Sequence, residues 1–196
     1  MREQPEVRHD VPSQSRRGFL FDGMRLALSG AAIGLLAGSP RLVRANVTSD
    51  DQAERDANIL ATALGAEREA IAAYLLGANS GLLSSDVLSV ALSFQGHHKE
   101  HADALANAIR QLGGTVPEPP KRFNFPVEQF RNQTDVLEFA AGLERGAVSA
   151  YAGAIPLFEN RDLSKAAASI LADEAMHWAV LRQALGLDPV PGAFFS

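Results

Sequence analysis

The stretch Asp173-Glu174-Ala175-Met176-His177-Trp178 (DEAMHW) lies in a segment whose apolar residues recur every three or four positions, as on one face of an α-helix. Glu174 and His177 both fall on this apolar stripe. Side chains three residues apart share a helix face, with about 5–6 Å between their Cβ atoms. The stripe therefore carries a carboxylate and an imidazole into the core, which is costly unless they are paired or bind a metal ion.

Three further segments show the same helical periodicity, and alternating strand patterns are absent. The predicted helices span about residues 49–76, 86–112, 134–155 and 162–185. Ser, Thr or Asp stands near each start and Gly or Pro near each end, with Gly77 as the predicted stop of the first helix. Short turns join the helices within each pair, whereas a proline-rich connection of about residues 113–133 joins the pairs. This pattern predicts an all-α four-helix bundle of two hairpins and one long crossover.

Each predicted helix carries an apolar stripe with one or two ionisable residues near its middle. The stripes are Leu60, Leu64, Glu67, Ile71 and Tyr74; Ala91, Phe94, His98, His101, Leu105, Ala108 and Leu112; Leu137, Ala141, Glu144, Val148, Tyr151 and Ile155; and Ile170, Glu174, His177, Leu181 and Ala184. Because the apolar neighbours fix the phase, the ionisable groups should point into the bundle. A metal site would explain six such groups at matching heights. The alternative is a bundle that has lost its metal, whose six groups hydrogen-bond to one another and to water.

The two predicted hairpins also repeat one another. Glu67 and Tyr74 are seven residues apart, as are Glu144 and Tyr151, and the first pair lies 77 residues before the second. The segment that begins at His101 resembles the one that begins 76 residues later. We expect the two tyrosines to be core aromatics with hydrogen-bonded hydroxyls.

One Glu from each of two helices, with Glu-x-x-His from each of the other two, forms the dinuclear carboxylate site of ferritin-like bundles. On Glu67, the HHKEH segment (97–101), Glu144 and Glu174-x-x-His177, the chain resembles the ferritin-like superfamily over most of residues 50–188. It is similar in particular to exported bacterial ferritin-like proteins, some of them desiccation-related. The resemblance implies two divalent metal ions, iron or manganese with zinc as the alternative. The ligands that it implies are Glu67, His98, His101, Glu144, Glu174 and His177.

The second helix departs from the family pattern, because it supplies His98-x-x-His101 instead of Glu-x-x-His. Three carboxylates leave more positive charge on two divalent ions, which disfavours an oxidised dimetal state. The departure also fits an asymmetric site, a mononuclear site or a different metal. His97 competes with His98 as a ligand, since it lies four residues before His101. Glu69 and Glu100 fall off the stripes, and we expect both to be solvated.

The N-terminus resembles a twin-arginine export signal: Arg16-Arg17, then a Gly/Ala-rich apolar run, and small residues before a cleavage position after Ala45. The alternative, a single membrane anchor, needs a longer uninterrupted apolar run. We therefore expect a leader at residues 1–45, a bundle at 46–188 and a tail at 189–196. The protein should reach the periplasm already folded, meeting a membrane only during export. The tail, PVPGAFFS, either docks on a second subunit of a homo-oligomer or covers the bundle end.

Composition narrows the function classes. The leader holds 7 of the 18 basic and 4 of the 23 acidic residues, so the remainder has 11 and 19 and a net charge of −8. An acidic body argues against nucleic acid as a partner. The absence of cysteine excludes disulfides and thiolate metal sites. The resemblance implies a redox enzyme that turns over peroxide or oxygen with an electron donor, in stress protection; the alternatives are metal binding without turnover and a structural stress-protection role.

Overall fold

Four long helices form the molecule in the computed structural model, which describes residues 49–195. They are α3 (Ser49–Asn79), α4 (Ser85–Gln111), α5 (Gln133–Ala154) and α6 (Arg161–Ala184), with short 3₁₀ turns η1 (Val127–Gln129) and η2 (Ile155–Leu157). The predicted all-α four-helix bundle is confirmed, and residues 49–195 contain no strand. Within the same residues, no helix is long and apolar enough to cross a membrane. The predicted leader and its cleavage position lie outside the described residues.

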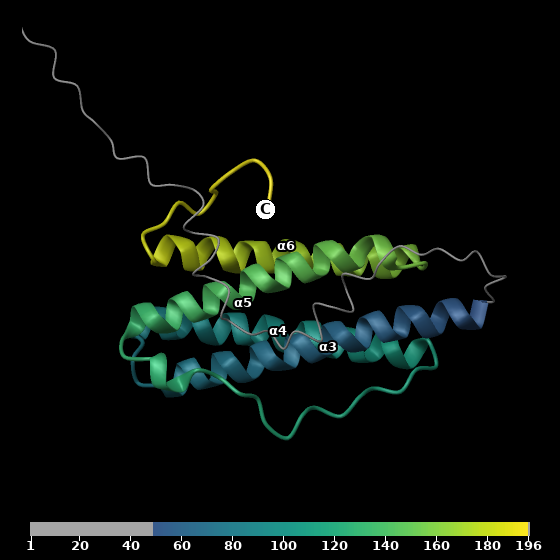
Figure 1. Cartoon of the computed structure of the whole chain (residues 1–196), viewed down its shortest axis with the longest axis horizontal. Helices are drawn as coiled ribbons and strands as arrows, with labels where there is room; N and C mark the ends of the chain where they lie inside the picture. The colour runs from purple at the N-terminus through teal and green to yellow at the C-terminus, as the bar shows by residue number, and fades with distance from the viewer. Residues whose placement is uncertain (1–48, 196) are drawn as a thin grey trace, which may run out of the picture.

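The helices are wired as two hairpins. Figure 1 shows α3 beside α4 and α5 beside α6, with the crossover between α4 and α5 running along the length of the bundle. The hairpins meet where α3 packs against α5. The crossover is fastened to the bundle, because Arg68 donates a hydrogen bond to the carbonyl of Pro117 at 2.5 Å. Phe125 and Phe130 also pack on Phe139 of α5, with ring centroids 5.8 and 5.1 Å away.

Asparagines cap α5 and α6, where the sequence pattern favoured Thr134 and Asp162 as starting residues. The Asn132 side chain accepts a hydrogen bond from the Asp135 amide at 3.1 Å, and Asn160 accepts one from the Asp162 amide at 2.8 Å. Each asparagine oxygen satisfies an amide that has no partner inside its helix. The two helices therefore begin slightly earlier than predicted.

Gly77 does not end α3, so this predicted stop is wrong. The helix continues to Asn79, and the glycine with positive φ follows it at Gly81. Gly77 is buried, and a Cβ atom there would lie 3.1 Å from Cγ1 of Val136. A glycine at this position lets α3 and the start of α5 approach closely, which is a packing role that its place in the sequence did not reveal.

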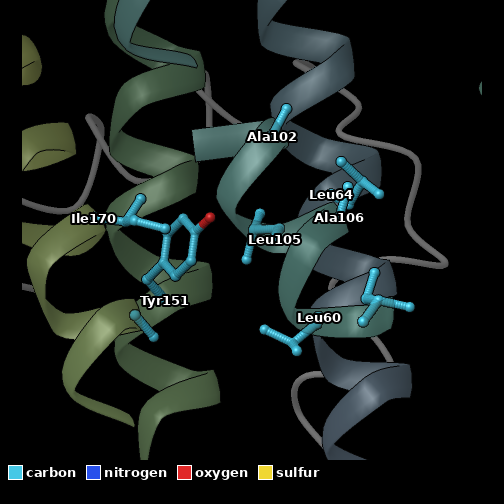
Figure 2. Packing of buried hydrophobic residues seen from close by; sticks show 9 residues of the cluster. Leu60, Leu64, Ala102, Leu105, Ala106, Tyr151 and Ile170 are labelled. Carbon is cyan, nitrogen blue, oxygen red and sulfur yellow. The ribbon is translucent and has the colours of Figure 1, made fainter. Parts of the chain in front are cut away.

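Two apolar clusters lie on either side of a polar layer. Figure 2 shows the first, in which Tyr151 and Ile170 meet Leu105. Its buried members are Leu60, Leu64, Ala102, Leu105, Ala106, Ile109, Tyr151, Ala167 and Ile170, and those of the second are Tyr74, Phe94, Leu137, Ala141 and Leu181. Along α3, Leu60 and Leu64 of the first cluster come before Glu67, and Tyr74 of the second cluster comes after it. Nearly all predicted stripe residues are at least partly buried, but Ala184 is exposed because the stripe ends before the last residue of α6.

Candidate metal centre

The polar layer contains the six residues that the sequence singled out, and all four helices contribute to it. They are Glu67 of α3, His98 and His101 of α4, Glu144 of α5, and Glu174 and His177 of α6. Five of them are buried, and Glu174 has no exposed surface. The side chain of His101 keeps 14% exposure. The structure therefore brings together, in the bundle interior, groups that lie up to 110 residues apart in the sequence.

The first group of converging ligand atoms comes from Glu67, His98, His101 and Glu174. Oε2 of Glu67 lies 2.8 Å from Nδ1 of His98 and 3.5 Å from Nδ1 of His101. Oε1 of Glu174 lies 3.0 Å from Nδ1 of His101. Two carboxylate oxygens and two imidazole nitrogens thus surround one point.

The second group consists of His98, Glu144, Glu174 and His177. Oε1 of Glu144 lies 3.3 Å from Nε2 of His98 and 3.6 Å from Nδ1 of His177. Oε2 of Glu174 also lies 3.6 Å from Nδ1 of His177. Glu174 and His98 belong to both groups. The carboxylate offers a different oxygen to each group, and the imidazole offers a different nitrogen.

Several buried atoms of this layer lack a hydrogen-bond partner although they are close together. They are Nδ1 of His101, Oε2 of Glu144, both carboxylate oxygens of Glu174 and Nδ1 of His177. A buried polar atom without a partner costs about 1–3 kcal/mol, and more for a charged group. Nδ1 of His101 lies 3.0 Å from Oε1 of Glu174, and Nδ1 of His177 lies 3.6 Å from Oε2 of Glu174. A cation between these side chains would satisfy such atoms together. The donor set, carboxylates with imidazoles, suits iron, manganese or zinc.

Two buried tyrosines hold the carboxylates of α3 and α5. Tyr151 of α5 donates a hydrogen bond to Oε1 of Glu67 at 2.5 Å, and Tyr74 of α3 donates one to Oε1 of Glu144. Burial and the adjacent carboxylates raise the pKa of each tyrosine well above its usual value, so both remain protonated donors. The expectation that these tyrosines are core aromatics with bonded hydroxyls is confirmed.

The histidines of the layer bind protons tightly. Burial acts to lower the pKa of His98, but hydrogen bonds with Glu144 and Glu67 outweigh it and raise the pKa to about 10. Burial also acts to lower the pKa values of His101 and His177, but contacts with the carboxylates outweigh it and raise both to about 9. For Glu67 and Glu144, burial acts in the opposite direction and would raise the pKa, but hydrogen bonds with the histidines outweigh burial and lower both pKa values. A metal ion would thus replace protons, because only a ring nitrogen without hydrogen can bind it.

Asp173 and His97 form an outer layer; the sequence reasoning considered His97 only as a competitor of His98 and did not assign Asp173. Oδ2 of Asp173 lies 3.4 Å from Nε2 of His101 and 3.2 Å from Nε2 of His177. Nδ1 of His97 lies 2.9 Å from the same nitrogen of His177. The sequence held a signal for this pair, since the 76-residue offset that relates His101 to His177 also relates His97 to Asp173. The structure places His98 inside the buried groups of ligand atoms and His97 outside them.

A cavity of about 50 Å³ between α3 and α5 reaches the carboxylates of Glu67 and Glu144. Small side chains form much of its wall: Ala63, Ala66, Ala70, Gly146, Ala147 and Ala150. One water occupies about 30 Å³ in the liquid, so the cavity suits a molecule of a few atoms. Glu69 also lines it, and burial raises the pKa of this half-buried carboxyl. Glu100 is exposed, as expected, whereas the prediction of a solvated Glu69 holds only in part.

Aromatic residues surround the α6 side of the layer. Phe94 stacks on the ring of His177, with 4.0 Å between ring centroids. Trp178 packs beside the second apolar cluster and meets the ring of Phe195 from the tail, with centroids 5.4 Å apart. Met176 and Phe194 stay exposed, at 59% and 91%. Part of the tail therefore covers α6 through Phe195, and Phe194 faces solvent.

The model of the ferritin-like domain matches residues 55–187 of the chain. A conserved hypothetical protein from Mycobacterium tuberculosis is 22% identical, with a TM-score of 0.63 over 73% of this chain and 99% of that one. A structure described as ferritin-like, diiron-carboxylate, from Bacillus anthracis strain Ames is 23% identical, with a TM-score of 0.59 over 70% of this chain and 99% of that one. At these identities the likeness shows the fold. No curated protein matches the chain.

Proposed function

Since the chain belongs to the ferritin-like domain family, we propose that its buried Glu/His cluster holds two divalent metal ions, iron or manganese, with zinc as the alternative. Glu67, His101 and Oε1 of Glu174 would hold one ion. Glu144, His177 and Oε2 of Glu174 would hold the other. The observation that carries the proposal is the set of five buried ligand atoms without hydrogen-bond partners, which belong to four side chains of two converging groups inside the bundle core.

His98 makes this centre asymmetric. Its two nitrogens face the two groups, at 2.8 Å from Glu67 and 3.3 Å from Glu144. A neutral imidazole has one nitrogen free to bind metal while the other carries hydrogen. One ion therefore receives His98 as a fourth ligand from the chain, and the other ion has three. The two ions should differ in affinity.

The activity that this site favours is turnover of peroxide or dioxygen. A dimetal centre, when bound, can exchange electrons with an oxygen–oxygen bond at an open coordination position. The cavity between α3 and α5 would admit a molecule of that size to the side of Glu67 and Glu144. Tyr74 and Tyr151 would keep these two carboxylates in position by donating hydrogen bonds. The imidazole in place of the fourth carboxylate favours a second candidate, metal binding without turnover, because it leaves more positive charge on the ions.

The cellular setting completes the proposal. The paired arginines at positions 16 and 17 and the apolar run after them support export of the folded protein to the periplasm. The resemblance to exported ferritin-like proteins supports a role in stress protection. Folding before export would let the centre acquire iron or manganese before it meets copper and zinc, which bind such ligands more tightly. The exposed Phe194 supports a homo-oligomer.

Elemental analysis of the protein purified from the periplasm of its host tests this proposal. The wild type should contain about two iron or manganese ions per chain, and the Glu174→Ala/His177→Ala variant should contain fewer than one. Oxygen evolution from added hydrogen peroxide should follow the metal content. Absence of stoichiometric metal in the wild type would refute the metal centre, whereas bound metal without oxygen evolution or dioxygen consumption would favour metal binding without turnover.

A further inference from the structure

A second cluster of metal-binding side chains lies beside the buried centre, formed by His97, Asp173 and His177. Nδ1 of His97 lies 2.9 Å from Nε2 of His177 and 3.1 Å from Oδ2 of Asp173. The third side, from Nε2 of His177 to Oδ2 of Asp173, measures 3.2 Å. The three atoms form a nearly equilateral triangle.

This triangle has the size of one face of a coordination polyhedron. Metal bonds to imidazole nitrogen and carboxylate oxygen are about 2.0–2.2 Å long. Two such bonds at right angles place their donor atoms about 3 Å apart, which is the spacing found here. Two imidazoles and one carboxylate on one face are the ligands with which proteins bind Fe²⁺ and Zn²⁺ while leaving the remaining positions open.

The cluster leads from solvent to the interior. The side chain of His97 is 43% exposed and that of Asp173 is 23% exposed, whereas His177 keeps only 2%. His97 belongs to α4, and the other two belong to α6. The cavity that reaches Glu67 and Glu144 lies instead between α3 and α5. In a bundle whose hairpins meet through α3 and α5, these are two different approaches to the polar layer.

His177 belongs to the outer cluster and to the buried centre at the same time. Its Nε2 completes the outer triangle, and its Nδ1 lies 3.6 Å from Glu144 and from Glu174. Because a neutral ring keeps hydrogen on one nitrogen, it can bind metal on the outer side or on the inner side, but not on both. Occupation of the inner position would release the outer one. The shared ring thus fits a site that a metal ion occupies in passing.

We propose that His97, Asp173 and His177 form a capture site, at which a divalent transition-metal ion binds before it enters the buried centre. This inference rests on the proposed dinuclear centre, because the captured ion needs an inner site to reach. His97 is the residue that distinguishes the capture site from the buried centre. It contacts Nε2 of His177 and is not among the six inner ligands. Removing it should slow filling of the centre and leave the final occupancy unchanged.

Co²⁺ is a suitable probe, because its visible absorption reports ligand binding and it does not turn over under anaerobic conditions. Co²⁺ in slight excess over two ions per chain is mixed with the metal-free full chain in a stopped-flow instrument, and the amplitude and rate of the absorption change are recorded. The His97→Ala variant removes one corner of the triangle, and His97→Asp keeps a ligand there. Glu100→Ala, an exposed change on the same helix, controls for surface charge.

The capture site predicts that all variants reach the same final cobalt content of about two per chain, while His97→Ala fills about tenfold more slowly. His97→Asp should recover most of the rate, and Glu100→Ala should match the wild type. Filling of His97→Ala at the wild-type rate, with two cobalt ions still bound, would overturn the capture site and leave the proposed centre standing. Failure of the wild type to bind Co²⁺ would overturn the proposed centre, and the inference with it.

Discussion

The hydroxyl of Tyr151 on α5 donates a hydrogen bond of 2.5 Å to Glu67 on α3. The reciprocal bond runs from Tyr74 on α3 to Glu144 on α5. Each hairpin thus orients a carboxylate of the other. The Glu/Tyr repeat detected in the sequence corresponds to two reciprocal hydrogen bonds, each from the tyrosine of one hairpin to the glutamate of the other. Glu67 thereby keeps its second oxygen, Oε2, at 2.8 Å from His98, whereas in Glu144 the oxygen bonded by the tyrosine also faces His98 and His177.

Tyr151→Phe should lower both stability and metal affinity, because it leaves Oε1 of Glu67 buried without a donor. The expected loss is about 1–3 kcal/mol in the free energy of unfolding of the metal-free protein. Loss of an outer partner weakens metal binding by about 10- to 100-fold. Urea unfolding and anaerobic metal titration measure the two effects. Tyr74→Phe should behave alike, and full affinity in both variants would show that the tyrosines only fill space.

The metal-free protein should lose stability as pH rises from about 6.5 to 10. The folded-state pKa values of His98, His101 and His177, about 10, 9 and 9, exceed the ordinary value of 6.5. Tighter proton binding stabilises the folded state fully below pH 6.5, and this stabilisation is lost as pH rises through 9 to 10. Each histidine contributes a slope of at most about 1.4 kcal/mol per pH unit. Urea unfolding at pH 7 and 9.5 tests this, and a flat profile would contradict the predicted proton binding.

Glu174→Ala should remove most of the thermal stabilisation that metal gives, because Glu174 faces both groups of ligands. Metal at 100 times its dissociation constant should stabilise the wild type by about 2.7 kcal/mol per site. That corresponds to a rise in melting temperature of roughly 5–10 °C for a chain of this size. The variant should gain less than half of this rise. An equal gain in both proteins would place the metal elsewhere.

His98→Glu should tighten binding of the second ion, because a carboxylate can offer one oxygen to each ion without losing a hydrogen. The expected increase in affinity is about tenfold, equivalent to about 1.4 kcal/mol. The cost is lower stability of the metal-free protein, which would hold four neighbouring carboxylates in place of three. Calorimetric titration with Mn²⁺ separates the two binding steps. Unchanged affinities would mean that His98 does not limit the second site.

Asp56→Ala should unfold the protein more readily without changing its metal content. Asp56 is 2% exposed and accepts hydrogen bonds from the amides of Glu159 and Asn160, both at 3.0 Å. Its removal leaves two amides unpaired before α6, at a cost of about 2–4 kcal/mol. Guanidinium unfolding and elemental analysis test the two statements. If the variant contained less metal under conditions that fill the wild type, this carboxylate would support the metal centre as well.

Sequence periodicity was sufficient for the bundle and for its polar layer. Stripes with spacings of three and four place Glu67, Glu144 and Glu174 on inward faces, because apolar neighbours fix the rotation of each helix. The same argument favoured His98, which follows Phe94 by four residues and precedes His101 by three. The helix ends were less predictable, since an asparagine two residues before a Thr or Asp competes with it as a cap.

The outer layer depended on tertiary contacts that periodicity does not reach. Asp173 adjoins Glu174 in sequence, but it acts on the ring of His101 from the other hairpin. Glycine commonly ends a helix, yet the role of Gly77 is close packing against Val136. In both cases the decisive partner is distant in sequence. The 76-residue offset between His97 and Asp173 was the one available signal for their pairing.

Anomalous X-ray diffraction from crystals of the protein loaded with Mn²⁺ tests the central claim most directly. Two peaks are predicted inside the polar layer. One should lie among Glu67, His101 and Glu174, and the other among Glu144, His177 and Glu174. A map with no anomalous peak between these side chains would contradict the account, and would leave the layer as a set of hydrogen-bonded charges in the bundle core.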